Sequence, residues 1–286
     1  MMQPETPREV LTAVRTANDL IFDVDLTLTE RQKNLSADLA AVLANSGKRL
    51  GICTSRALNE LDEVFNGLGQ ENSRSALIRG PVVLEDGGLV IKPGDAAPTL
   101  LVPKEHYEAV TTLVDYIKRQ IDREGCIDDT WYRLKGLDSP LVHLPTRYDY
   151  KTSFSIWQHH EAGLDVLKTL LPNTMEWVQG AVSKLGVGDN LHLLEIGDGT
   201  LRIAAPGRSK GVALRELHQD GVLDLSRTVY FGDGKNDVPA AEVIRQFGGV
   251  MVAVDTHCRE LVDLASYTLP ARGPEGLRRF LAGTFR

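Results

Sequence analysis

Two aspartates, Asp23 and Asp25, directly follow an apolar run at residues 20–22. Such a run predicts a short buried strand, and α/β proteins place their chemistry at the carboxyl ends of parallel strands. Residues two apart point the same way while a strand stays extended, so both acids can enter one pocket. Two carboxylates this close repel each other and usually need a cation between them. The sequence therefore predicts a metal-dependent active site at this point.

Other polar residues follow apolar or helical segments elsewhere in the chain and are expected to converge on the same sheet edge. They are Thr27, Thr54, Lys210, Asp233, Asn236 and Asp237. Together with the two acids they suit phosphoryl transfer, in which one carboxylate attacks phosphorus to form an aspartyl-phosphate. A second carboxylate protonates the leaving oxygen and then deprotonates the attacking water. A hydroxyl, a lysine and Mg²⁺, which prefers oxygen ligands, would stabilise charge on the transferred oxygens.

The segments that position these residues alternate between strands and helices at both ends of the chain. Near the start, strands are expected at 20–22, 49–55 and 75–78, with a helix capped by Ser36 and another ending near Leu68. Near the end, we expect helices from Ser209 and Val238, strands at 228–231, 250–254 and 267–269, and a final helix. This alternation predicts an α/β fold with a parallel, doubly wound sheet.

The middle of the chain has a different rhythm. A hairpin is expected at 81–91 and a linker at 92–103, followed by an amphipathic helix at 110–121. A strand at 150–157, a helix at 164–171 and a hairpin joining 191–196 to 201–204 come next. We therefore expect a discontinuous core domain, residues 1–87 and 206–286, with an inserted α+β domain at 88–205.

Composition narrows the class of protein. At 286 residues the chain exceeds a typical single domain, and 32 basic against 39 acidic residues give a net charge of −7. This charge argues against binding to nucleic acid backbones. Three scattered cysteines, no signal-peptide pattern and no run of membrane-spanning length predict a cytoplasmic enzyme without a membrane partner. We expect a monomer or homodimer that acts on a small molecule.

Four motifs, in order, resemble those of the haloacid-dehalogenase-like (HAD) phosphohydrolases. They are DVDLT at residues 23–27, Thr54, Ser209-Lys210-Gly211, and GDGKND at residues 232–237. The fourth is similar to that of the type IIB branch, which includes Cof-like sugar phosphatases, sucrose-phosphate and trehalose-phosphate phosphatases, and phosphomannomutase. The resemblance covers the whole chain, including the place of the insertion. It implies a Rossmann-like core with a parallel sheet and an inserted α+β cap.

The resemblance also implies a role for each matching residue. Asp23 would be the nucleophile, and Asp25 the general acid and base. The phosphoryl group would be bound with the help of Thr27, Thr54, Ser55 and Lys210, and Mg²⁺ by Asp23, the backbone carbonyl of Asp25, Asp233, Asn236 and Asp237. In the cap, Arg147 and Lys151 are candidates for binding an acidic or phosphorylated substrate.

The chain departs from the pattern of this branch at two positions. Leu26 stands where glycine is common, and Thr54-Ser55-Arg56 stands where Thr-Gly-Arg is frequent. The function expected is a Mg²⁺-dependent phosphomonoesterase acting on a sugar phosphate or a phosphorylated acid. One alternative is a phosphomannomutase-like phosphotransferase, whose start is also similar to residues 22–33, although the compact GDGKND favours a phosphatase. Another is a non-catalytic phosphometabolite-binding protein, against which the full set of acids argues, because buried carboxylates without chemistry only cost stability.

Overall fold

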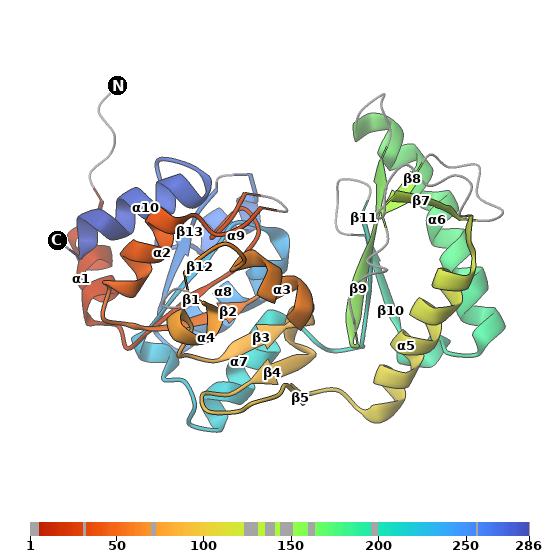
Figure 1. Cartoon of the computed structure of the whole chain (residues 1–286), viewed down its shortest axis with the longest axis horizontal. Coiled ribbons are helices and arrows are strands. Elements are labelled where there is room, and N and C mark those ends of the chain that lie inside the picture. Colours follow the sequence, from red (N-terminus) through yellow and green to blue (C-terminus); the bar gives the residue numbers. More distant parts are fainter. Residues whose placement is uncertain are drawn as a thin grey trace. The chain divides into compact units, whose positions relative to one another are not determined.

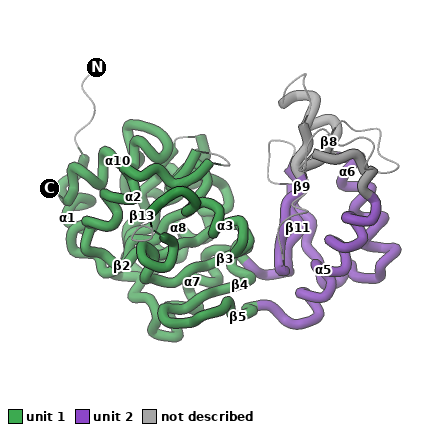
Figure 2. Tube along the Cα trace, in the orientation of Figure 1, with its two compact units in different colours: residues 1–101, 209–286 green, residues 102–208 purple. Residues whose placement is uncertain are grey.

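The protein consists of two compact units in a computed structural model that describes residues 6–30, 33–69, 73–122, 131–134, 141–143, 151–159, 164–195, 200–255 and 257–285. The first unit comprises residues 1–101 and 209–286, and the second comprises residues 102–208 (Figure 2). Among the described residues, none of the helices is both long enough and apolar enough to span a bilayer.

The first unit is built on a sheet whose described strands follow the order β14-β13-β12-β1-β2-β3-β4-β5 (Figure 1). The strands are β1 (Asp19–Phe22), β2 (Arg49–Cys53), β3 (Val82–Leu84), β4 (Leu89–Ile91), β5 (Thr99–Leu100), β12 (Thr228–Gly232), β13 (Val250–Ala253) and β14 (Tyr267–Thr268). Pairing is parallel from β14 to β3 and antiparallel from β3 to β5. The mainly parallel sheet confirms the predicted α/β class.

Helices cover both faces of this sheet. They are α1 (Arg8–Thr16), α2 (Ala37–Ala44), α3 (Leu58–Val64), α4 (Arg74–Leu77), α7 (Lys210–Gln219), α8 (Val238–Gln246), α9 (Arg259–Leu264) and α10 (Gly273–Thr284), with short 3₁₀ turns η2 (Glu85–Gly87), η5 (Leu225–Arg227) and η6 (Lys235–Asp237). In β1, Leu20 and Phe22 enter one hydrophobic cluster with α1, α2 and α10, while Ile21 enters another with α7 and α8. Burial on both faces explains why the central strands read as unbroken apolar runs.

Several expected elements are confirmed. Strands form where the apolar runs predicted them at 20–22, 228–231 and 250–254. The hydroxyl of Ser36 accepts a hydrogen bond from the Leu39 amide at 3.3 Å, and that of Ser209 accepts one from Val212 at 3.2 Å. Both serines therefore cap helices as the sequence predicted.

One expected strand was wrong. Residues 74–77 form helix α4, and the third parallel strand is β3, the first arm of the predicted hairpin. A short apolar run cannot by itself distinguish a strand from a turn of helix. The N-terminal helix α1 was not predicted.

The expected boundary between core and insertion, after residue 87, also differs from the boundary of the two units. The second arm of the hairpin, β4, pairs antiparallel with β3, and β5 pairs with β4 in the same sheet. These hydrogen bonds keep residues 88–101 with the first unit, and the return to that unit falls at residue 209 rather than 206.

The second unit is an antiparallel sheet with two helices packed on it. Its described strands follow the order β10-β11-β9-β8-β7-β6. Its elements are α5 (Lys104–Arg119), β6 (Ile121–Asp122), β7 (Trp131–Leu134), β8 (Leu141–His143), β9 (Ser153–His159), α6 (Leu164–Leu185), η4 (Gly188–Asn190), β10 (His192–Glu195) and β11 (Thr200–Ala204). Val110 and Val178 of the helices share a cluster with Phe154 and Leu201 of the sheet. The expected hairpin is confirmed as β10 and β11.

Candidate active site

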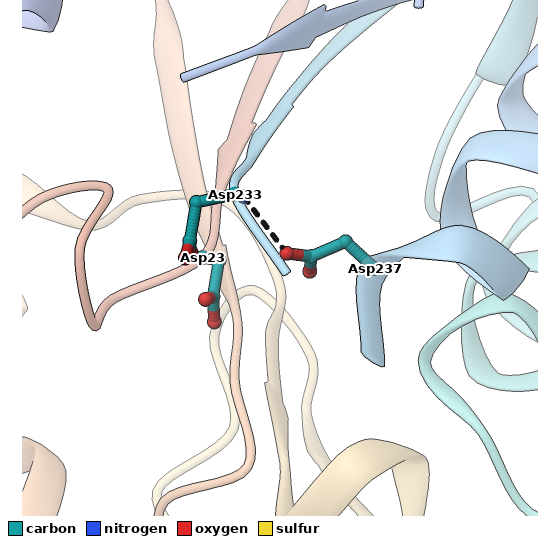
Figure 3. A group of neighbouring side chains, drawn as sticks. All are labelled: Asp23, Asp233 and Asp237. Carbon is teal, nitrogen blue, oxygen red and sulfur yellow. Dashed lines mark hydrogen bonds between the residues drawn. The ribbon is translucent and has the colours of Figure 1, made fainter. Parts of the chain in front are cut away.

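The acids predicted at two strand ends lie side by side because their strands are neighbours. Strands β1 and β12 pair in parallel with Phe22 opposite Phe231, and the Asp23 amide donates to the Phe231 carbonyl at 2.9 Å. Asp23, Asp233 and Asp237 converge at this edge, each with a carboxylate oxygen within 4.8 Å of the others (Figure 3). The structure thus forms a cluster of three carboxylates, which we call the acidic cluster.

Lys210 lies against this cluster and is fully buried. Its ammonium donates to Asp23 Oδ1 at 2.8 Å and to Asp237 Oδ1 at 2.6 Å. The lysine is the first residue of α7, and Gly211 follows it. A Cβ at Gly211 would collide with the backbone carbonyl of Pro239, so glycine allows α7 to approach the start of α8 closely. This close approach places the ammonium between the two carboxylates.

Each of the two carboxylate oxygens of Asp237 accepts two hydrogen bonds. Oδ1 accepts from Lys210 and from the Tyr230 hydroxyl at 2.6 Å, and Oδ2 accepts from the amides of Asp233 and Gly234 at 3.0 and 3.1 Å. Asp237 therefore fixes both the lysine and the loop that carries Asp233. A Cβ on Gly232 would lie 2.6 Å from the Asp237 carboxyl carbon, which is why the carboxylate can fold back onto this loop.

Tyr230 was missed by the sequence analysis, which treated residues 228–231 as a plain apolar strand. Its side chain is fully buried, and this burial raises the pKa of the hydroxyl well above its usual value. The negative charge of Asp237 is the second cause and acts in the same direction. The hydroxyl therefore stays protonated and donates to Asp237. A tyrosine inside a buried strand was the available signal, because a buried hydroxyl requires a partner.

Tyr230→Phe should lower the free energy of unfolding by about 1–2 kcal/mol, because it removes a buried hydrogen bond to a carboxylate while preserving the ring. Urea denaturation measures the change. Tyr267→Phe is a matched control, because the Tyr267 hydroxyl is hydrogen-bonded to the neutral Thr6 hydroxyl, at 3.1 Å in a partly buried setting, rather than to a carboxylate. Equal losses in the two variants would contradict this role for Tyr230.

Electrostatics in the acidic cluster favour a bound cation. Burial raises the pKa of Asp23 well above its ordinary value, Lys210 opposes this, and Asp237 adds to it. Burial and then Asp237 raise the pKa of Asp233 to about 7. Burial by itself would lower the pKa of Lys210, but Asp23 and Asp237 raise it well above its usual value, so the lysine stays charged. One ammonium thus contacts two of three crowded carboxyl groups, and a bound cation would relieve the repulsion that raises the pKa values of Asp23 and Asp233. Carboxylate oxygens are the hard donors that Mg²⁺ prefers.

The loop after β1 supplies the remaining residues of the first motif. The buried Thr27 hydroxyl donates to Asp233 Oδ1 at 3.3 Å, which links this loop to the acidic cluster. Leu26 has a φ of 57°, in the left-handed region that favours glycine. Leucine at this position therefore adopts a backbone conformation that glycine reaches without a steric penalty.

Asp25 does not belong to the acidic cluster among the described residues. Its carboxylate instead accepts two hydrogen bonds from the guanidinium of Arg56, a residue to which the sequence analysis assigned no role. Thr54 is buried after β2 and its hydroxyl accepts from the Arg56 amide at 3.3 Å, while Ser55 between them is half-buried. The signal that could have identified Arg56 is its position two residues after Thr54.

The other predicted residues lie in different surroundings. Asn236 is half-buried in the turn η6, next to Asp237. Lys151 belongs to the second unit, where its ammonium lies 5.9 Å from the centre of the Tyr107 ring. Arg147 lies outside the described residues.

Comparison with known proteins gives consistent matches. A sequence model of haloacid dehalogenase-like hydrolases matches residues 20–281. The chain is similar to the 5-amino-6-(5-phospho-D-ribitylamino)uracil phosphatase YbjI of Escherichia coli (strain K12), with 26% identity over 203 residues. The match covers 68% of this chain and 70% of the relative.

Solved structures share the fold. Protein 0175 of Thermoplasma acidophilum matches with a TM-score of 0.59 and 15% identity, over 94% of this chain and 98% of that one. A sugar phosphatase of HAD subclass IIB, BT4131, matches with a TM-score of 0.53 and 15% identity, over 93% and 98% of the two chains.

Proposed function

Because this chain belongs to the haloacid dehalogenase-like hydrolase family, we propose that it is a Mg²⁺-dependent phosphatase that forms an aspartyl-phosphate on Asp23. The observation that supports the proposal is the acidic cluster with the buried Lys210, in which a nucleophilic carboxylate, an ammonium and oxygen donors of the kind that Mg²⁺ prefers meet at one sheet edge. No described group other than Asp23 combines contact with Lys210 and a position directly at the end of β1.

In the proposed reaction, a carboxylate oxygen of Asp23 attacks the phosphorus atom and the bond to the leaving oxygen breaks. Asp25 gives its proton to that oxygen, so the alcohol leaves neutral. Water then attacks the phosphorus of the aspartyl-phosphate and passes a proton to Asp25, which releases phosphate and restores Asp23. Lys210 orients Asp23 throughout and, with Thr54, would bind the oxygens of the transferred group.

Mg²⁺ supplies positive charge against the phosphoryl oxygens when it is bound. Asp23 and Asp233 are the best placed to hold it directly. Asp237 already accepts four hydrogen bonds, so we assign it the task of fixing the Asp233 loop and Lys210. Asn236 and the Asp25 carbonyl complete the proposed set.

The proposed substrate is a small phosphorylated metabolite, a sugar phosphate or a phosphorylated acid. The E. coli relative is named for a phosphorylated ribityl compound, and one structural neighbour is named a sugar phosphatase, so phosphorylated sugars and sugar alcohols come first. The second unit, with Lys151 as a candidate residue, is proposed to select among them.

Release of free phosphate tests the function directly. A panel of phosphorylated sugars, sugar alcohols, glycerates and an aryl phosphate is incubated with Mg²⁺ or with chelator. Mg²⁺-dependent release is expected, concentrated on one compound class. Transfer of the phosphoryl group to a second sugar without free phosphate would replace the phosphatase by a mutase, and binding without turnover would leave a binding protein.

Mg²⁺ should raise the melting temperature more at pH 8 than at pH 5.5. The pKa of Asp233 without metal is about 7, against an ordinary value of 3.8, so between these values the folded protein holds a proton that the unfolded chain has lost. Without metal, the contribution of Asp233 to the free energy of unfolding therefore falls as pH rises through that window. The ionised carboxylate formed at high pH binds Mg²⁺ better than the protonated form.

Thermal denaturation with Mg²⁺ and with chelator at the two pH values measures this difference. Asp233→Asn is the control and should weaken the dependence of the Mg²⁺ shift on pH, leaving the part that comes from Asp23, whose pKa is also raised. An equal Mg²⁺ shift at both pH values in the unmodified protein would contradict the assignment of Asp233 to the cation site.

A further inference from the structure

Arg56 holds the carboxylate of Asp25 through two parallel hydrogen bonds. Its Nε donates to Oδ2 at 2.9 Å and its Nη2 donates to Oδ1 at 2.7 Å. A bidentate guanidinium fixes the plane of a carboxylate as well as attracting its charge. Asp25 therefore has one defined orientation, even though 32% of its side chain is exposed.

Arg56 is itself held in place by the surrounding backbone. Its amide donates to the Thr54 hydroxyl, its carbonyl accepts from the Glu85 amide at 3.2 Å, and its Nη1 lies 3.4 Å from the Glu60 carbonyl. Only 8% of its side chain is exposed. The guanidinium therefore has a fixed position between β2 and α3, unlike an exposed arginine, which can move together with the carboxylate that it binds.

Among the described residues of the loop that carries Asp25, no side chain is hydrogen-bonded to the Asp25 carboxylate, so Arg56 sets its direction. Asp25 and Thr29 form a β-bridge that fixes the backbone, and the Thr27 hydroxyl contacts Asp233 rather than Asp25. Asp23, in contrast, is oriented by Lys210. The two aspartates of the first motif are therefore positioned by two different cations from separate elements, Lys210 of α7 and Arg56 of the loop after β2.

We propose that Arg56 is the positioning residue for Asp25 in proton transfer to the leaving oxygen, an inference that rests on the proposed function. Without the guanidinium, the Asp25 carboxyl group samples other rotamers and delivers its proton less often. Attack by Asp23 on phosphorus does not involve Arg56. The decrease in kcat/KM on removal of the Arg56 guanidinium should consequently depend on how strongly the leaving group needs a proton.

Two substrates that differ in this need provide the test. The oxygen of a sugar-alcohol phosphate leaves as a poor, basic alkoxide unless it is protonated, whereas 4-nitrophenolate leaves readily without a proton. In Arg56→Ala, kcat/KM for the alkyl ester should fall by about 10²-fold or more, and that for 4-nitrophenyl phosphate by less than about 10-fold. Arg56→Lys should fall between Arg56→Ala and the unmodified protein, because an ammonium cannot make the bidentate contact.

A double-mutant cycle identifies the partner. In an Asp25→Asn background, Arg56→Ala should cause little further loss on the alkyl ester, because the group that it positions is already absent. Equal losses on both esters, or full additivity with Asp25→Asn, would overturn the inference while leaving the phosphatase assignment intact. If the unmodified protein cleaves neither ester in Mg²⁺, the proposed function fails and this inference with it.

Arg74→Ala is a matched control. Arg74 also pairs through its Nε with a carboxylate, that of Asp62, but on the surface of α3 and α4. This variant should leave kcat/KM for both esters unchanged. Thermal denaturation of each variant identifies those that fold, and Arg56→Lys retains a cation in the buried position if Arg56→Ala does not.

Discussion

Asp23→Asn is expected to lower kcat by at least about 10⁴-fold on every phosphate ester that the unmodified protein cleaves. Asparagine keeps the size of the side chain and an oxygen that can accept from Lys210, but its amide is a poor nucleophile. The decrease in kcat should be similar for esters with good and with poor leaving groups, because the variant cannot form the aspartyl-phosphate. Phosphate release measures the rate, and mass spectrometry of acid-quenched enzyme detects the phosphorylated peptide containing residue 23 in the unmodified protein alone.

The fold should survive this change. Burial and the neighbouring carboxylates already disfavour the charged form of Asp23, so its neutral replacement removes crowding from the acidic cluster. The melting temperature without metal should therefore remain close to that of the unmodified protein. Asp62→Asn, a change of the same type on an exposed side chain, should retain full activity. Substantial hydrolysis by a folded Asp23→Asn variant would refute the proposed nucleophile.

Lys210→Met is expected to lower the free energy of unfolding by about 3–5 kcal/mol and to abolish turnover. Methionine preserves the length of the chain but leaves Asp23 and Asp237 without their shared ammonium in a fully buried site. Uncompensated buried carboxylates are costly, so they take up protons, and a protonated Asp23 cannot attack phosphorus. Urea denaturation and phosphate release measure the two losses.

A surface lysine provides the comparison that separates burial from pairing. Lys92 donates to Asp220 Oδ2 at 2.8 Å, the same distance as from Lys210 to Asp23, but these two side chains are 36% and 51% exposed. Lys92→Met should change stability by less than about 1 kcal/mol, because solvent screens exposed pairs. Similar losses in the two variants would show that the buried position of Lys210 is not the source of its effect.

A second change should partly rescue the buried site. Adding Asp237→Asn to Lys210→Met removes one of the two unpaired carboxylates, and should recover part of the lost stability but none of the activity. Recovery of turnover would contradict the proposed role of Lys210 in orienting Asp23.

The sequence by itself identified the α/β class and the strand ends that carry the acids. Buried parallel strands read as unbroken apolar runs, so Asp23 and Asp233 could be placed at strand ends from local pattern alone. The serine caps of α2 and α7 were also local signals. The prediction of a strand at 75–78 was wrong because four residues are too few to show a helical or strand periodicity. Residues 88–101 were assigned to the inserted domain because the sequence of one strand does not reveal which strand it pairs with.

Only the tertiary structure decided how the charged groups pair. Lys210 and Asp23 are 187 residues apart in the chain, and Arg56 and Asp25 are 31 apart, so their contacts depend on strand order and helix approach rather than on local pattern. Burial, which sets the protonation of Asp23, Asp233 and Tyr230, likewise arises only when the sheet and its helices close together. Residue types thus determined which chemistry was available, while packing determined which carboxylate each cation holds, because pairing and desolvation are properties of neighbours in space.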